Sequence, residues 1–186
     1  ETAGESLCGS VHVPADPRRA QDLARRLVAC AGDAVLTTLV HAFLAEVKGL
    51  ETDLFAYVRL TLEKGCCVDG WHGHPQVRAV LDPVRRVNRE VHRCKGLLRF
   101  QELSDGTLYA AFAPDHNITM LLGQHFARRL ADQRWVIHDC RRQLALFWDG
   151  ARLAPVETPR DLENLPRSSQ ELQLQELWRT YHRRIA

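Results

Sequence analysis

The chain has 186 residues, of which 45% are hydrophobic and 26% are charged, and its formal net charge is +2. This length and apolar content predict one globular domain with a buried core. No apolar run is long enough to span a membrane, and the polar first residues are not a secretory leader. These features exclude a membrane-spanning protein, and we expect a cytoplasmic protein without membrane contact.

The spacing of the six cysteines matches no disulfide or metal framework, although their even number leaves disulfide pairing open. None of them has CxxC spacing, and Cys66 and Cys67 are adjacent. In a chain without a secretion signal this pattern favours reduced thiols. The sequence also does not begin with Met, and we expect it to be a fragment of a longer chain.

The first half of the chain predicts helices. Residues 14–65 read as three short helices, with Asp16-Pro17 as a helix start and with Gly32, Gly49 and Gly65 as ends. A fourth helix begins at Pro75 and has apolar residues at helical spacing. Pro83 lies inside this pattern, which predicts a kink or break near Asp82.

The middle of the chain predicts strands around one helix. Ser104-Asp105-Gly106 is a hairpin signal between two apolar runs. Asp115 and Asn117 are suited to cap the helix that follows. The predicted strands are Leu97–Leu103, Thr107–Ala113, Trp135–Asp139 and Leu144–Trp148. Near the end of the chain, Ser168-Ser169-Gln170-Glu171 is a capping-box pattern. Apolar residues at helical spacing come after it, so we predict a last helix there.

These elements predict an α+β fold, in which N-terminal helices pack on an antiparallel ββαββ sheet core with a C-terminal helix. We expect a single domain over residues 1–186. It would have a mainly helical part at 1–92, the ββαββ core at 93–150, and an extended segment with the last helix at 151–186.

The basic residues are the first candidates for function. All but three of the 25 Lys and Arg side chains are arginine, which suits bidentate phosphate contacts. Arginine-rich codon usage and an ordinary solvated surface remain open as explanations. Arg99 and Gln101 alternate with Leu98 and Phe100 and should share one sheet face. The candidate nucleic-acid-binding residues are Arg86, Arg89, His92, Arg93, Lys95, Arg99, Arg128, Arg129 and Arg134.

The candidates for catalysis are His125, Asp132 and His92, because a histidine near a carboxylate can transfer protons. A core histidine that only makes a structural hydrogen bond, to a carbonyl or to Asp132, is the simpler interpretation of His125. His138 and Asp139 are neighbours on a predicted strand and should point to opposite faces. The sequence lacks the motifs of common hydrolases, nucleotide-binding proteins and deaminases. We therefore leave enzymatic activity open and expect no metal and no cofactor.

Four blocks carry a family resemblance: HRCKGLLRFQEL, APDHN, QHFARRLADQRWVIHD and LALFWDG. They resemble a bacterial domain family of unknown biochemical activity that is described as DNA-repair or DNA-metabolism proteins. Members of that family are encoded beside a radical-SAM protein, and some are fused to a UdgX-type uracil-DNA glycosylase domain. The resemblance extends from about Pro14 to the end of the chain.

The resemblance implies a bacterial DNA-repair or DNA-metabolism accessory module. Such a module would bind DNA through an arginine-rich face and act with a radical-SAM protein or a uracil-DNA glycosylase-like domain. Two alternatives stay open. One is a nucleic-acid-processing enzyme with a His/Asp/Arg pocket, and the other is a protein-interaction scaffold that does not contact DNA.

Overall fold

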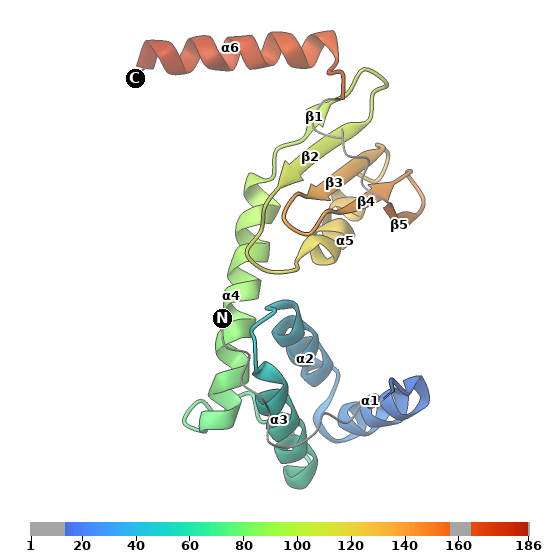
Figure 1. The fold of residues 1–186 in the computed structure, drawn as a ribbon, viewed down its shortest axis with the longest axis vertical. Coiled ribbons are helices and arrows are strands. Elements are labelled where there is room, and N and C mark those ends of the chain that lie inside the picture. The colour runs from blue at the N-terminus through green and yellow to red at the C-terminus, as the bar shows by residue number, and fades with distance from the viewer. Residues whose placement is uncertain (1–13, 157–164, 186) are drawn as a thin grey trace, which may run out of the picture.

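The computed structural model describes residues 14–156 and 165–185. A helical part and a sheet part share one long helix, α4 (Pro75–Leu97), which runs through both (Figure 1). No helix within the described ranges is long and apolar enough to cross a membrane.

The helical part contains the three short helices that the sequence predicts, α1 (Pro17–Ala31), α2 (Ala34–Leu44) and α3 (Leu50–Lys64). The Asp16 carboxylate caps α1 by accepting hydrogen bonds from the backbone N–H groups of Arg18 and Arg19, at 3.0 and 3.1 Å. All three helices pack with the first half of α4 around an apolar core. This core contains Leu27, Val35, Tyr57, Val77 and Val80.

Helix α4 is continuous, and the predicted break near Asp82 does not occur. Pro83 lies inside the helix and is buried. The neighbouring residues Val80 and Val84 are also buried in the helical core. Proline removes one backbone hydrogen bond from a helix, but packing of the turns on both sides of Pro83 stabilises the helical conformation.

The sheet part confirms the α+β class. Its five strands lie in the order β1-β2-β3-β4-β5, and α5 connects β2 to β3. The elements are β1 (Gln101–Glu102), β2 (Leu108–Phe112), α5 (Thr119–Arg129), β3 (Trp135–Asp139), β4 (Leu144–Trp148) and β5 (Leu153–Val156).

The sheet is mixed, so the prediction of a wholly antiparallel sheet is wrong in this detail. β2 and β3 pair in parallel, with Ala110 opposite Ile137, whereas the other neighbours pair antiparallel. The cause is α5, which carries the chain from the carboxyl end of β2 back to the end of the sheet where β2 began. β3 therefore runs in the same direction as β2, and α5 is a crossover connection. A fifth strand also forms in residues that the sequence suggested were an extended segment.

A second core lies between the sheet, α5 and the end of α4. Its residues include Val87, Val91, Leu122, Phe126, Trp135 and Ile137. The Phe100 ring packs edge-on against Phe126 and Trp135, with centroids 5.0 and 6.3 Å apart. Arg99 is exposed and pairs elsewhere, which confirms the predicted alternation of faces. At Gly123 a Cβ atom would lie 2.7 Å from Leu146 Cδ1, so any larger residue here would require the Leu146 side chain to move.

Helix α6 (Ser169–Ile185) extends away from the sheet (Figure 1). Ser168 Oγ accepts a hydrogen bond from the Glu171 backbone N–H at 3.1 Å, which confirms the N-terminal half of the predicted capping box. Leu172, Leu174 and Leu177 are exposed on this helix.

Candidate nucleic-acid interface and neighbouring polar cluster

Helix α4 exposes arginines along one side. Arg86, Arg89 and Arg93 are all exposed, and helical periodicity places them within roughly 60° of one another around the axis. We call these three residues the α4 stripe. In the part of the chain that the structure describes, no acidic side chain pairs with Arg86 or Arg89, and Arg93 is 3.6 Å from Glu90. The stripe is therefore a region of largely unneutralised positive charge.

The other arginines of α4 share one carboxylate. Asp82 pairs with Arg85 at 2.9 Å and with Arg78 at 3.8 Å. The α4 stripe therefore begins where this shared partner ends, and it continues toward the sheet.

Lys95 does not belong to the stripe, because it lies roughly 150° around the helix from it. There it meets the end of α5, where Arg129 donates a hydrogen bond to the Lys95 carbonyl at 3.3 Å. Arg128 lies beside Arg129 and is exposed. The predicted nucleic-acid-binding residues therefore form two groups on different sides of α4. Arg134 is separate from both and donates to the Asp105 carbonyl at 3.2 Å.

His125 lies close to the second basic group. Burial lowers the pKa of His125, and the charges of Lys95, Arg129 and Arg128 lower it further. Its ring packs edge-on against Phe126, 5.0 Å away. Within the described residues no hydrogen bond or ion pair joins His125 to Asp132 or to His92. The catalytic role of these three residues stays a prediction.

A cavity of about 400 Å³ opens where α4 ends. We call it the α4 cavity. The charged residues that line it, within the described part of the chain, are Arg93, Arg99 and Arg167. Its apolar lining includes Cys94, Leu97, Leu98, Ala111 and Phe112, and Gln101 and Tyr109 complete it. Arg167 Nε donates to Gln101 Oε1 at 2.7 Å, and its guanidinium lies 5.6 Å from the centre of the Tyr109 ring.

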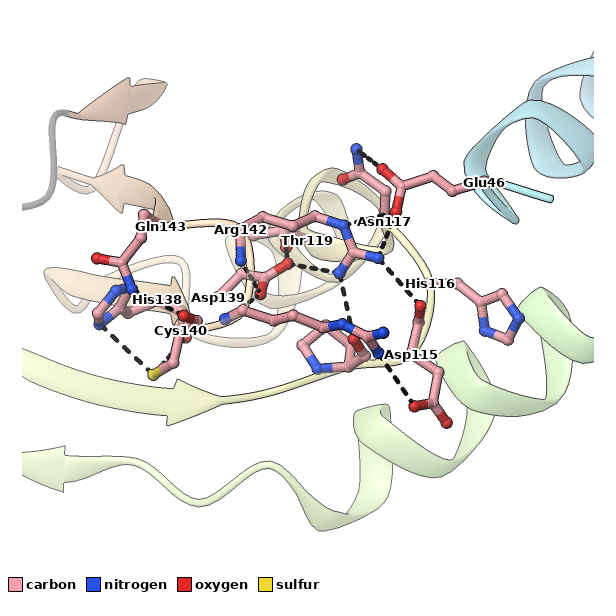
Figure 2. Close-up of polar contacts among 12 residues, drawn as sticks. Glu46, Asp115, His116, Asn117, Thr119, His138, Asp139, Cys140, Arg142 and Gln143 are labelled. Atoms are coloured by element: carbon pink, nitrogen blue, oxygen red, sulfur yellow. Dashed lines mark hydrogen bonds and ion pairs between the residues drawn. The ribbon is translucent and has the colours of Figure 1, made fainter. Parts of the chain in front are cut away.

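A buried polar cluster lies at the carboxyl ends of β2 and β3 (Figure 2). The Asp139 carboxylate is fully buried. It accepts hydrogen bonds from the backbone N–H groups of Arg141 and Arg142, at 3.0 and 3.1 Å, and from Thr119 Oγ1 at 3.3 Å. The guanidinium of Arg142 completes this shell, with Nη1 3.1 Å from Asp139.

Arg142 connects the sheet to the helical part. Its Nε and Nη2 donate to Glu46 at 2.9 and 2.5 Å, while Nη1 and Nη2 also donate to the Pro114 and Asp115 carbonyls at 3.2 and 3.0 Å. The hydrogen bond from Arg142 lowers the pKa of the Glu46 carboxyl. Asn117, which we predicted to cap α5, also donates to Glu46, and α5 has no side-chain cap.

The buried Glu90 and the partly buried His116 form a second pair beside this cluster. The Glu90 carboxylate accepts from the Asp115 and His116 backbone N–H groups at 2.8 and 3.0 Å, and it lies 2.6 Å from His116 Nδ1. Burial opposes ionisation of Glu90, but these hydrogen bonds outweigh it and keep its pKa below the usual value.

His138 and Asp139 point to opposite faces of the sheet, as predicted. His138 Nδ1 lies 2.8 Å from the hydroxyl of Tyr109, whereas Asp139 faces Thr119 and Arg142. Among the described residues no three His, Cys, Asp or Glu side chains gather in a way that would hold a metal ion.

One comparison with known proteins identifies a family. The family model described as a domain of unknown function, DUF4130, matches residues 48–186. The chain belongs to this family. The match includes α3, α4, the whole sheet and α6, so the α4 stripe and the α4 cavity lie within the DUF4130 domain. Searches of the curated proteins and of the solved structures gave no significant match.

Proposed function

We propose that this DUF4130 protein is a nucleic-acid-binding accessory module of DNA repair or DNA metabolism. The observation that carries the proposal is the α4 stripe, where Arg86 and Arg89 have no acidic partner among the described residues. Arginine is well suited to phosphate because its planar guanidinium donates two parallel hydrogen bonds. The buried face of α4 packs in two cores, so the stripe is held on a rigid support.

The stripe is long enough for more than one phosphate. With a rise of 1.5 Å per residue, Arg86 and Arg93 are separated by about 10 Å along the helix axis. Contacts of this kind position a strand without reading its sequence. We therefore expect binding that depends strongly on salt and only weakly on base order.

The test is a salt titration of DNA binding by a variant that carries Arg86→Ala, Arg89→Ala and Arg93→Ala. Each lost contact should change the slope of log K against log salt by about 0.7 on single strands. Three lost contacts should therefore flatten the slope by about 2 units. Adding Lys95→Ala tests whether the second basic group contributes to the same binding surface.

The control removes the same charge from another surface. Arg19, Arg25 and Arg59 are exposed arginines of α1 and α3, and each pairs with a carboxylate on its own helix or at its cap. The triple alanine variant at these positions should keep the parental slope. If both variants lose affinity equally, net charge explains the binding and the stripe does not.

The DNA-repair setting and the partner are supported by the family resemblance of the sequence blocks. We expect the protein to act with a radical-SAM protein or with a uracil-DNA glycosylase-like domain. Pull-down of the tagged protein with a radical-SAM protein from the same genome, with and without DNA, tests this proposal. Failure to recover the partner under both conditions would contradict it.

A protein-interaction scaffold is the second candidate, and α6 favours it. Leu174 and Leu177 are 52% and 67% exposed, and apolar side chains exposed together mark interaction surfaces. The sequence places Trp178 and Tyr181 at helical spacing from these leucines, but the side chains of both lie outside the described residues. Under the scaffold hypothesis, Leu174→Ser with Leu177→Ser would abolish partner recovery, and the stripe variant would leave it unchanged.

A further inference from the structure

The α4 cavity joins a charged rim to an apolar floor. The rim is formed by Arg93 and Arg99, whose side chains are 62% and 54% exposed. Leu97 and the exposed Ala111 form part of the floor. A volume of about 400 Å³ lies in the range of ordinary small-ligand sites. A ligand that binds both the charged rim and the apolar floor has an anionic group next to a flat, largely apolar group.

The rim arginines keep much of their hydrogen-bonding capacity for a ligand. The nearest carboxylates, Glu90 for Arg93 and Glu171 for Arg99, are each 3.6 Å away. Both carboxylates also have other partners, because Glu90 accepts from Asp115 and His116 and Glu171 accepts from Gln175 at 2.8 Å. Neither glutamate lines the cavity.

Arg93 belongs both to the α4 stripe and to the cavity. A strand whose phosphates follow Arg86 and Arg89 would therefore reach the cavity at Arg93. A base paired in a duplex is stacked on its neighbours and is not available to enter such a cavity, whereas an unpaired base is.

We propose that the α4 cavity binds one unpaired nucleotide of a nucleic-acid strand. The phosphate of this nucleotide lies against Arg93 and Arg99, and its base lies against the floor around Ala111. This inference rests on the proposed function and adds that the protein recognises single-stranded or locally opened nucleic acid.

The experiment compares two strands of equal length by fluorescence anisotropy. One is a short oligothymidylate, and the other carries abasic sites in place of every base, so the two differ in bases and share the same phosphates. The parent protein should bind the oligothymidylate more tightly by about five-fold, the lower end of what stacking of one base on an aromatic ring contributes, because much of the floor is aliphatic. A fully paired duplex, whose bases are not available to the cavity, should bind equally to the parent protein and to a variant whose cavity is narrowed.

Two variants then separate the cavity from the stripe. Ala111→Leu narrows the cavity at a position that is already exposed, and it adds neither charge nor an aromatic ring on which a base could stack. It should remove the preference for the oligothymidylate, while the α4 stripe still binds the abasic strand in a salt-dependent way. Ala34→Leu, at an exposed position of α2 outside the cavity, is the matched control and should keep the preference. Thermal melts of both variants verify folding.

The outcomes distinguish this inference from the proposed function. Salt-dependent binding of the abasic strand without any gain from bases would overturn the inference and leave the proposed function standing. Retention of the preference in a folded Ala111→Leu variant would overturn it as well. Equal affinity for the two strands would also overturn it, and saturable binding of free thymidine monophosphate that is lost in Ala111→Leu would then assign the cavity to free nucleotides. No binding of any strand would refute both proposals.

Discussion

Replacing Arg142 tests how strongly the buried polar cluster stabilises the fold. Arg142→Met keeps most of the side-chain volume and removes the charge. Asp139, whose side chain has 0% exposure, would then keep its hydrogen bonds from two backbone N–H groups and Thr119 but lose its counterion. Removing one partner of a buried ion pair costs about 3–5 kcal/mol. The Arg142 side chain is only 12% exposed, so we expect a loss of this size in the free energy of unfolding.

The contribution of Glu46 should be much smaller. Its side chain is 47% exposed, and ion pairs at such sites contribute about 0–1 kcal/mol. Glu46→Gln should therefore cost at most about 1 kcal/mol. Arg141→Met is the matched control, because the Arg141 side chain is exposed and pairs with the exposed Asp115.

The assay is urea unfolding followed by tryptophan fluorescence, since Trp135 and Trp148 stack in the sheet core. A shift in the midpoint with an unchanged slope reports a change in stability. If Arg142→Met cost no more than Arg141→Met, Arg142 would not stabilise Asp139, and the argument from burial would be refuted.

Two further predictions concern titratable groups. Because the pKa of folded His125 lies below its ordinary 6.5, the unfolded chain binds the proton first and stability falls as pH drops below that value. His125→Gln should flatten this fall, and equal pH profiles of the melting temperature would contradict it. Since the pKa of folded Glu90 is also lowered, its stabilisation is present above the ordinary 4.5 and is lost as pH falls through the folded value. Glu90→Gln should cost about 1–3 kcal/mol at neutral pH, because an amide cannot accept all three hydrogen bonds, and an unchanged urea midpoint would refute this.

Local sequence patterns predict the helices and the strand faces well. The spacing of apolar residues in α1 to α3 reflects one buried side of each helix, and the period of two at Leu98–Gln101 reflects one buried face of an extended segment. Each of these signals depends on neighbouring residues only. For this reason Phe100 and Arg99 have the environments that their positions predict.

The pairing of distant segments is not encoded in such patterns. A helix between two strands is compatible with either strand direction at the level of local spacing, and β1 pairs over only two residues. The parallel pairing of β2 with β3 brings their carboxyl ends together, as is common at ligand sites of parallel strands. Because we predicted an antiparallel sheet, we did not predict that these two carboxyl ends lie together. The hydrogen bond between Arg142 and Glu46 was also not predictable from local patterns, because the two residues are 96 positions apart.

The continuity of α4 also bears on how the protein unfolds. Val84 lies in the helical core and Val87 in the sheet core, although less than one helical turn separates them. Fraying of α4 in one part would therefore remove packing from the other part within the same turn. The two cores should melt in a single cooperative transition, as one folding unit with two apolar centres. Hydrogen exchange of the amides from Val84 to Val91 should accordingly report the global free energy of unfolding.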